Sequence, residues 1–480
     1  MASEPPVEVD GVASPVPSVE PPRRRKRRTW VVAAVAVIVA ASIVVAIALL
    51  VGHDDDDGGA QAASSLSVVP SPAPVAVAGE KPNVVIIMSD DQRWDKITRR
   101  YTPNIWSLAH QAGSTYFTNS YVTNPVCCPS RTTVLSGKYS HTTGVWTNGG
   151  SYGGFSAFND KHTLAVDFQD QGYRTALVGK YLNGYTAGQM RYVPPGWSKW
   201  FASSVGAYYN WGVTTNNHLL HFGDRPKDYS TRVLKNEAVD FVTKNTGPFF
   251  LYFAPSAPHA PAIPDPRDIH RFDSEPDFHF NGWKFSSALE SAYGVDRAVG
   301  QLLGVLPPDT IVLYMSDNGY LWHEQESNRG SKSGKNWPYN ASIRVPMIFA
   351  SLDGSVAPNA GVDDIVANVD LRTTLLHAVG LAPLTSQEGI NWMSRNYTPR
   401  DHLLIEHWEP RAPTYCGIRT ADYMYARFHN PHGSYTEELF AEDPVDEATN
   451  LARTETDLLD RLSAQARAEC DPAPPGYTWP

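Results

Sequence analysis

The amino-acid sequence predicts an α/β fold, in which helices sandwich a large, mixed and mostly parallel sheet, with a small α+β subdomain at the C-terminus. Continuous apolar runs such as Val84–Met88 and Ile311–Met315 are typical of strands buried on both faces. Amphipathic helical segments such as 232–242 alternate with these runs, as in parallel α/β sheets. We therefore expect a main domain over residues 81–398 and the subdomain over residues 399–480.

The first 80 residues have a different composition and predict a membrane anchor. Residues 1–29 form a tail with six consecutive basic side chains, Arg23–Arg28, and residues 30–52 are 23 positions without a charge. An uncharged stretch of this length can cross a bilayer as a helix, with the basic side in the cytoplasm. Residues 53–80 predict a flexible linker, since Ala, Ser, Pro and Gly dominate after a short acidic run. We expect a single-pass protein of the cell membrane with an extracellular body, and secretion after signal cleavage is the alternative.

Charge and cysteine usage restrict the partners and the compartment. The formal net charge is −10, although the tail is basic, and an acidic body argues against nucleic acid as a partner. Disulfides persist in proteins outside the cell. The chain has four cysteines, of which Cys127 and Cys128 are adjacent and Cys416 and Cys470 are the other two. We expect Cys416 and Cys470 to form a disulfide.

Two of the predicted strands end in acidic residues in nearly the same way. The segment KPNVVIIMSDDQ ends in Asp90 and Asp91, and the segment DTIVLYMSDNGY ends in Asp317 and Asn318. Carboxylate and amide oxygens brought together at one sheet edge would bind a hard cation, either Ca²⁺ or Mg²⁺. Each acidic pair taken alone has a structural alternative, because aspartates after strands often cap the next helix.

Two further apolar runs lead into polar loops. The run Thr175–Val178 precedes Lys180, and the run Phe249–Phe253 precedes APSAPHAP, which contains His259. Ligands and catalytic groups of parallel sheets lie beyond the carboxyl ends of the strands. We expect these loops to converge on the acidic residues.

The segment CCPSRTTVLSGK combines two adjacent cysteines with a short predicted helix. Pro129 suits the first position of a helix and Gly137 can end it, so Cys127 would lie at the positive N-terminus. A nucleophile could meet an anion at this position. The alternative is a pair of buried cysteines that only pack.

The order of the motifs resembles the sulfatase family, which is part of the alkaline phosphatase superfamily. The resemblance rests on PNVVIIMSDDQ, CCPSRTTVLSGK, GKYLNGY, APHAP and SDNGY, and it covers nearly all of the expected ectodomain. VPPGWSKW, the nearby AYYNW and the late segment from YCGIRT to AEC look most like N-acetylglucosamine-6-sulfatase and related glycosaminoglycan sulfatases. The resemblance implies an alkaline phosphatase-like fold and sulfuric ester hydrolase activity.

The resemblance also implies roles for individual residues. Cys127 would be oxidised to Cα-formylglycine by a separate formylglycine-generating enzyme, with Cys128 as a packing neighbour. The hydrate of this formylglycine would attack the sulfur atom of the sulfate ester beside a bound Ca²⁺, with Mg²⁺ as the alternative ion. The ligands implied for that ion are Asp90, Asp91, Asp317, Asn318 and the residue formed from Cys127.

Four cationic positions match residues of the family's active site, and the motif arginine among them holds the hydrated aldehyde and the metal-site carboxylates. Arg131 matches the motif arginine, Lys180 and His259 match residues that contact sulfate or the leaving group, and Lys335 matches a second sulfate-binding lysine. Lys332 is the rival of Lys335. We expect these residues to complete the catalytic site.

The chain departs from the common family pattern at two positions. Leu182 and Asn183 follow GKY where many members have histidine two residues beyond the lysine, and Asn183 is expected to face the substrate. Asn340 stands where glutamate is frequent, which affects only the expected orientation of Lys335. His141 is expected to line the pocket, with a structural role as the alternative.

Together these features predict a formylglycine-dependent hydrolase of sulfate esters on a sulfated carbohydrate outside the cell. Two alternatives remain. A phosphodiesterase or phosphonate monoester hydrolase could use the same fold, and a non-catalytic glycan-binding protein could retain a decayed site.

Overall fold

The computed structural model describes residues 81–185, 192–203, 206–216, 218–276, 279–280, 283–322, 334–408, 412–442 and 449–480. The predicted tail 1–29, membrane helix 30–52 and linker 53–80 lie outside the described residues, so these three expectations stay predictions. Within the described part of the chain, no helix has the length and apolar character needed to cross a membrane.

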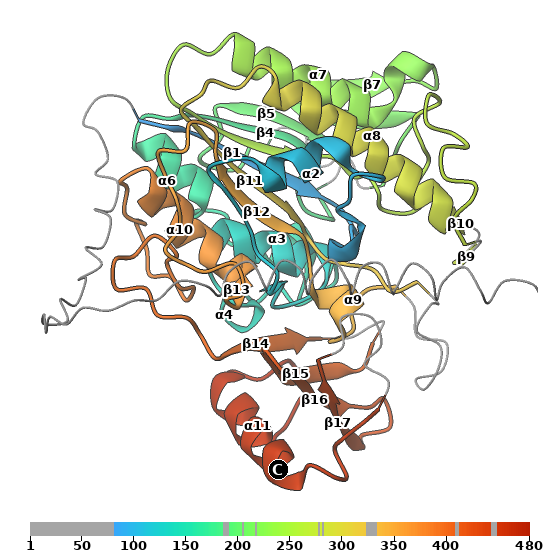
Figure 1. Ribbon diagram of the computed structural model, residues 1–480, viewed down its shortest axis with the longest axis vertical. Helices are drawn as coiled ribbons and strands as arrows, with labels where there is room; N and C mark the ends of the chain where they lie inside the picture. Colours follow the sequence, from blue (N-terminus) through green and yellow to red (C-terminus); the bar gives the residue numbers. More distant parts are fainter. Residues whose placement is uncertain are drawn as a thin grey trace, which may run out of the picture. The chain divides into compact units, whose positions relative to one another are not determined.

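The main sheet contains nine strands (Figure 1). They are β1 (Asn83–Ser89), β2 (Ser114–Tyr116), β4 (Arg174–Lys180), β5 (Lys199–Ser203), β6 (Trp211–Thr215), β7 (Leu219–Phe222), β8 (Phe249–Ala254), β11 (Thr310–Ser316) and β12 (Met347–Ser351). Their order in the sheet is β2-β12-β11-β1-β8-β4-β5-β6-β7. The five central strands are parallel, and the strand pairs at both edges are antiparallel. The predicted mixed sheet is confirmed.

Helices cover both faces of this sheet. The described helices of the main domain are α2 (Pro103–His110), α3 (Cys127–Ser136), α4 (Ser140–Thr143), α5 (Gly154–Ala157), α6 (Leu164–Asp170), α7 (Ser230–Thr243), α8 (Phe285–Leu303), α9 (Asn340–Ile343) and α10 (Leu371–Ala378). Short 3-10 turns are η1 (Trp94–Lys96), η3 (Pro226–Asp228) and η5 (Asn368–Asp370), and two-residue strands are β3 (Ser120–Tyr121), β9 (His279–Phe280), β10 (Trp283–Lys284) and β13 (Val366–Ala367). Figure 1 shows α7 and α8 on one side of the sheet and α6 and α10 on the other.

The buried strand β1 explains why its sequence is apolar without alternation. Val84, Ile86 and Met88 pack into the core under α3, α6 and α10, whereas Val85 and Ile87 pack into the core under α2, α7 and α8. Both faces of the strand are therefore removed from water, as expected of a central parallel strand. Alternate side chains of β1 therefore belong to two separate hydrophobic cores, one on each face of the sheet.

The helix of the cysteine segment begins earlier than predicted. Helix α3 starts at Cys127, so Pro129 occupies its third position instead of its first. A proline is tolerated there because the first-turn N–H groups have no intrahelical acceptor. The predicted end is confirmed, since Gly137 caps the helix with φ of 67° and its N–H donates to Thr133 O.

A second sheet follows at the C-terminus. It contains β14 (His402–His407), β15 (Thr414–Thr420), β16 (Tyr423–His429) and β17 (Tyr435–Ala441), all antiparallel, and α11 (Thr456–Glu469) packs on one face. The opposite face packs on residues of the main domain such as Tyr121 and Ile343. Cys416 of β15 and Cys470 form the expected disulfide. The strand β17 was not predicted, because YTEELFA carries three exposed or half-buried polar residues in a row.

Candidate active site

The strands β1 and β11 bring the two predicted acidic pairs together. They pair in parallel with Ser89 opposite Ser316, so the residues that follow each strand leave the sheet side by side. The N–H of Asp91 donates a hydrogen bond of 3.2 Å to Asp317 Oδ1. Asp91 has φ of 65°, a left-handed conformation that is uncommon outside glycine and is found at functional sites.

The side chain of Cys127 lies beside these carboxylates at the start of α3. It is fully buried, its Sγ is 3.7 Å from Asp90 Oδ1, and Lys335 Nζ donates to Sγ at 2.8 Å. Burial raises the pKa of the Cys127 thiol, although Lys180 and Lys335 oppose this shift. The unmodified side chain is therefore a neutral thiol, which is a weak nucleophile.

The neighbouring cysteine has different surroundings. Cys128 belongs to the apolar core under the sheet, and its Sγ accepts the N–H of Asn183 at 3.1 Å. Its own N–H donates to Asn148 Oδ1 at 2.8 Å. Asn183 thus contacts Cys128, and the hydrogen bonds described for Asn183 do not include Cys127.

Three buried cations balance the three carboxylates. Lys180 Nζ is 2.5 Å from Asp90 Oδ2, Lys335 Nζ is 2.7 Å from Asp91 Oδ1, and Arg131 Nε donates to Asp317 Oδ2 at 2.8 Å. These contacts join residues from β4, α3 and both acidic loops into one network. Lys335 is described and Lys332 is not, so only the first of the two rival lysines can be placed.

The network determines the charge state of each member. Burial by itself raises the pKa of Asp90, but Lys180, His259 and Arg131 outweigh it and leave that pKa below its usual range. Burial likewise lowers the pKa of Lys180, but Asp90 and Cys127 more than offset it, so the pKa is raised. Burial by itself also lowers the pKa of Lys335. Asp91, together with Cys127, outweighs this effect and holds that pKa well above its usual range. Asp90, Lys180 and Lys335 therefore stay ionised, as buried ion pairs require.

His259 is the accessible member of the cluster. Its Nδ1 lies 2.7 Å from Ala260 O, so this nitrogen carries the proton, and its Nε2 is 3.7 Å from Asp91 Oδ2. The His259 side chain is 22% exposed, whereas Lys180 is fully buried. His259 is therefore the member of the cluster that solvent reaches most readily, and its Nε2 faces the Asp91 carboxylate.

The residues fit the hard divalent cation that the sequence resemblance implies. Asp90, Asp91, Cys127 and His259 offer ligand atoms that lie within 4.8 Å of one another. Asn318 donates its Nδ2 to Asp91 Oδ1 at 2.5 Å, and its buried Oδ1 has no hydrogen-bond partner among the described residues. An unsatisfied buried amide oxygen beside carboxylates is a ligand set for Ca²⁺ or Mg²⁺. Asp317 is not part of this group of four, and its two oxygens accept from Arg131 and from the Asp91 N–H.

The remaining predicted residues are held by the C-terminal sheet. His141 Nδ1 lies 2.9 Å from Oε2 of Glu406 on β14, and the His141 N–H donates to Oε1 at 3.1 Å. Asn340 Nδ2 donates to Glu442 Oε2 at 3.2 Å, so Asn340 is anchored toward the C-terminal part of the chain. Sequence reasoning missed Glu406, although one signal was present: a carboxylate within the apolar run HLLIEH.

The chain is similar to known sulfatases. A family model described as Sulfatase matches residues 82–381. The chain is 32% identical to a Caenorhabditis elegans protein named as an extracellular sulfatase Sulf-1 homolog, over 62% of this chain and 47% of that protein. It is 28% identical to the N-acetylglucosamine-6-sulfatase of Homo sapiens, over 81% of this chain and 84% of that protein. The chain thus spans less than half the length of the first of these relatives.

The fold also matches solved structures. One is described as a complex with its substrate D-glucosamine-2-N,6-O-disulfate and aligns with a TM-score of 0.67 and 20% identity. The alignment covers 81% of this chain and 99% of that chain. At this identity the match establishes the fold, including the mixed sheet and the C-terminal antiparallel sheet.

Proposed function

The chain belongs to the sulfatase family, and from this premise we propose that it hydrolyses sulfate esters with a nucleophile built at position 127. One observation carries the proposal: Cys127 Sγ lies at the N-terminus of α3, 2.8 Å from Lys335 Nζ and 3.7 Å from Asp90 Oδ1. A helix N-terminus and ammonium groups both favour an anion at this point. The proposed reaction is hydrolysis of an organic sulfate to an alcohol and inorganic sulfate.

Cys127 is the precursor of the nucleophile in this proposal. Its buried, neutral thiol is poorly suited to attack, and the segment CCPSR matches the family motif that a formylglycine-generating enzyme modifies. One hydroxyl group of the Cα-formylglycine hydrate would attack sulfur and lose its proton, and the second hydroxyl group would then expel inorganic sulfate as the aldehyde C=O bond reforms. Water would add to the aldehyde and restore the hydrate. The site around position 127 is preformed for an oxygen of this kind, because Lys335 already donates to the atom it replaces.

The cations and the metal ligands stabilise charge that develops on the sulfate group. Lys180 and Lys335 are held in place by Asp90 and Asp91, and Arg131 holds Asp317, so little reorganisation is needed during reaction. These three aspartates and Asn318 would hold Ca²⁺ or Mg²⁺. A bound divalent cation supplies Lewis-acid polarisation of a sulfate oxygen.

His259 is the general acid that protonates the leaving group in this proposal. The bond between sulfur and the sugar oxygen breaks with its electron pair on that oxygen, which takes a proton from Nε2 of a protonated His259. Nδ1 is already committed to Ala260 O, which leaves Nε2 as the nitrogen that faces the site. A positioned general acid of this kind contributes about 10²–10⁴-fold to a rate.

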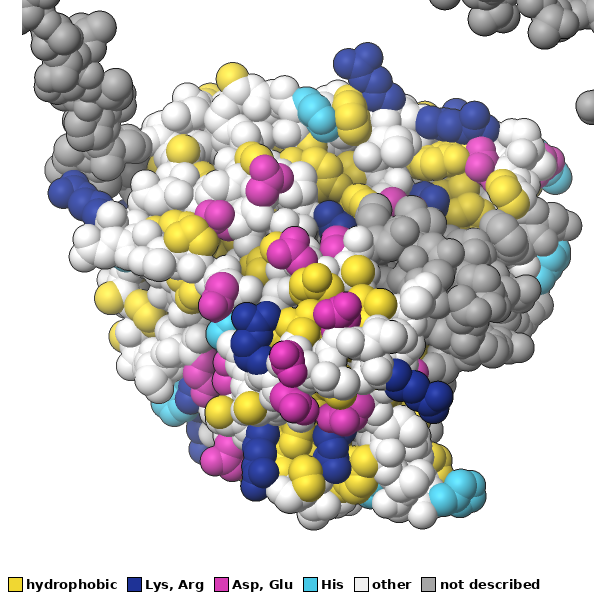
Figure 2. Space-filling view, turned by 60° about the horizontal axis from the view of Figure 1, so that its bottom comes forward, with side chains coloured by type: hydrophobic (Ala, Val, Ile, Leu, Met, Phe, Trp, Pro, Cys, Tyr) yellow, Lys and Arg dark blue, Asp and Glu magenta, His cyan; other side chains and the backbone are white. Residues whose placement is uncertain are grey.

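We place the substrate among sulfated carbohydrates and the protein outside the cell. The human relative is named for a sulfated N-acetylglucosamine, and the Caenorhabditis elegans relative is named as extracellular. The disulfide between Cys416 and Cys470 is consistent with an oxidising compartment. The predicted helix 30–52 would then serve as the membrane anchor. On the face in Figure 2 acidic and basic side chains are interspersed, so this face has no single sign of charge that would attract an anionic substrate over long distance.

Mass spectrometry and ester hydrolysis test the proposal together. The peptide containing Cys127 should show replacement of the thiol by an aldehyde when the full chain is made with a maturation enzyme, and the protein should hydrolyse an aryl sulfate. C127A should abolish hydrolysis, whereas the matched variant C128S should retain it. Faster turnover of the corresponding phosphate or phosphonate ester would favour the rival hydrolase. An intact thiol without hydrolysis would favour a glycan-binding protein.

A further inference from the structure

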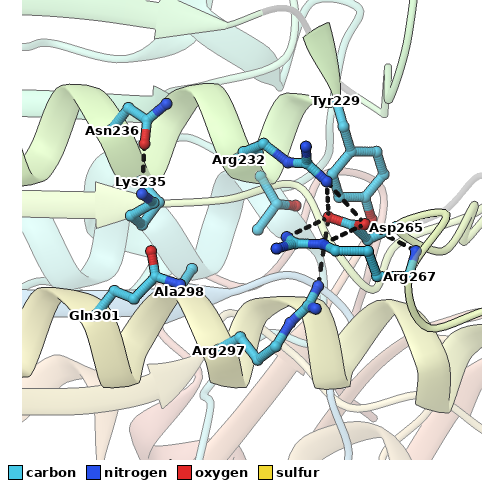
Figure 3. A pocket seen from close by; sticks show the side chains of 11 residues that line it. Tyr229, Arg232, Lys235, Asn236, Asp265, Arg267, Arg297, Ala298 and Gln301 are labelled. Atoms are coloured by element: carbon cyan, nitrogen blue, oxygen red, sulfur yellow. Dashed lines mark hydrogen bonds and ion pairs between the residues drawn. The ribbon is translucent and has the colours of Figure 1, made fainter. Parts of the chain in front are cut away.

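A second cationic cluster lies between α7, α8 and the segment after His259. It surrounds a pocket of about 150 Å³ whose charged lining is Arg232, Lys235, Arg267, Arg297 and a single carboxylate, Asp265. Figure 3 shows the three arginine side chains pointing toward Asp265 from different elements. The mechanism proposed above uses none of these residues.

The arginines have more donors than Asp265 can satisfy. Arg232 Nη2 donates to both Asp265 oxygens at 3.0 Å, and Arg267 donates through Nε and Nη2 at 3.0 and 2.9 Å. Arg297 Nη2 lies 3.3 Å from the same carboxylate and 2.6 Å from Asp268. Three guanidinium groups offer about fifteen N–H donors, against about eight acceptor sites on the two carboxylates Asp265 and Asp268.

Unsatisfied donors and excess charge remain at this pocket. The Nε atoms of Arg232 and Arg297 are buried and have no hydrogen-bond partner among the described residues. Burial, and then Arg267 and Arg232, lower the pKa of Lys235, as expected where cations crowd together without enough anions. Even with Asp268 counted, the side chains around the pocket carry a net positive charge. The pocket therefore favours an anion.

Its size limits the anion to one group. Pockets that enclose whole small molecules usually measure about 300–1,000 Å³, well above the volume here. A single tetrahedral anionic group attached to a larger chain fits these dimensions. Guanidinium groups are well matched to such a group because they donate paired, parallel hydrogen bonds.

The pocket is tied to the catalytic histidine through two neighbouring tyrosines. Tyr208 donates its hydroxyl to His259 O at 2.6 Å, Tyr229 donates to Ile263 O at 2.9 Å, and the two ring centroids are 5.9 Å apart. Asp265 follows His259 by six residues, so the Cα atoms of the two are at most about 20 Å apart. A chain of a few sugar residues can span such a separation.

We propose that this pocket is an exosite that binds a sulfate group on a second sugar residue of a polymeric substrate. The inference rests on the proposed function, because that function identifies the ligand as a sulfated carbohydrate. It goes beyond that function because it assigns a binding site to residues outside the catalytic cluster. The exosite would favour extended, multiply sulfated chains over isolated monosulfated sugars.

Binding measurements with a charge-reversed variant test the exosite. K235E places a carboxylate in the pocket, and Lys235 donates a hydrogen bond to Asn236. The matched control is K244E, because Lys244 is 71% exposed at the end of α7 and pairs with Asp240 outside the pocket. Calorimetric titration of the full chain with a heparin-derived hexasaccharide should show about tenfold weaker binding for K235E, equivalent to about 1.4 kcal/mol. K244E should bind as the parent protein does.

Kinetics and a second probe separate the possible results. K235E should raise KM for the sulfated hexasaccharide about tenfold, with kcat unchanged and hydrolysis of an aryl sulfate unchanged. Equal weakening by K235E and K244E, or inorganic sulfate binding as tightly as the hexasaccharide, would overturn the exosite. If the hexasaccharide binds and K235E weakens it while no ester is hydrolysed, the site stands as a glycan-binding site and the proposed activity fails.

Discussion

The ammonium group of Lys335 lies 2.8 Å from the sulfur of Cys127, although 208 residues of chain separate the two. The same ammonium is 2.7 Å from Asp91 Oδ1. Lys335 therefore connects the position of the proposed nucleophile with the proposed metal ligands. Its buried charge is balanced by Asp91, which keeps it protonated over the working range of pH.

Removing this ammonium should damage the chemical step. K335Q is expected to lower kcat/KM for an aryl sulfate about 10²–10³-fold, the loss typical of removing one preorganised donor from a developing oxyanion. The matched variant is K332Q, which changes the rival lysine and should leave kcat/KM nearly unchanged. The reverse result would transfer the role to Lys332. Mass analysis of the Cys127 peptide verifies that both variants carry the same modification.

Metal removal should inactivate the enzyme reversibly. Dialysis against EDTA is expected to abolish ester hydrolysis, and Ca²⁺ or Mg²⁺ should restore it. Calcium at a hundred times its Kd should also raise the free energy of unfolding by about 2.7 kcal/mol.

A single amide tests the ligand set. N318A should weaken calcium binding in a calorimetric titration by about 10–100-fold, the loss typical of disturbing a metal site. N148A, which alters the asparagine beside Cys128, serves as the control. Equal affinity of N318A and the parent protein would exclude Asn318 as a ligand.

The buried ion pair of Arg131 and Asp317 should be essential for stability. R131Q leaves Asp317 without its paired cation in a fully buried site, which is expected to cost about 3–5 kcal/mol of unfolding free energy. Urea denaturation followed by tryptophan fluorescence measures this loss. The comparison is R100Q, which breaks a pair whose arginine is 56% exposed and should cost less than about 1 kcal/mol. A similar effect of both variants would contradict the prediction.

The disulfide should stabilise the C-terminal sheet without affecting catalysis. The double variant C416A/C470A is expected to lose about 2–5 kcal/mol of unfolding free energy, because the crosslink closes a long loop in the unfolded chain. Activity at 25 °C should be retained, since neither cysteine contacts the catalytic cluster in the described structure. Loss of activity in a folded double variant would show that the C-terminal sheet supports the site more directly.

The pair His141 and Glu406 should make stability depend on pH. Burial by itself lowers the pKa of His141, but the hydrogen bond and charge of Glu406 outweigh it and raise the pKa above its ordinary value. The stabilisation is therefore complete below about pH 6.5, the unfolded value, and is lost as pH rises through the folded pKa. E406Q should cost more unfolding free energy at pH 6 than at pH 9. D273N, which changes the exposed partner of His270, should show little difference between the two.

Local sequence patterns were sufficient for much of the fold. The apolar runs Val84–Met88 and Ile311–Met315 are strands because a segment buried on both faces must be apolar at every position. Gly137 ends α3 because it adopts a left-handed conformation at little cost. The antiparallel strands β6 and β7 and the strand β17 were missed, since half-exposed strands at a sheet edge carry mixed side chains without a clear period.

By itself, the sequence determined which chemical groups are available: two acidic strand ends, a cysteine at a helix start, and a small set of cations. Only the tertiary structure decided which of them meet. Glu406 lies against His141 across a separation of 265 residues, and three arginines gather on Asp265 from α7, α8 and the loop between them. Such contacts arise from the packing of whole helices and sheets, which depends on side chains far apart in sequence and leaves no local pattern.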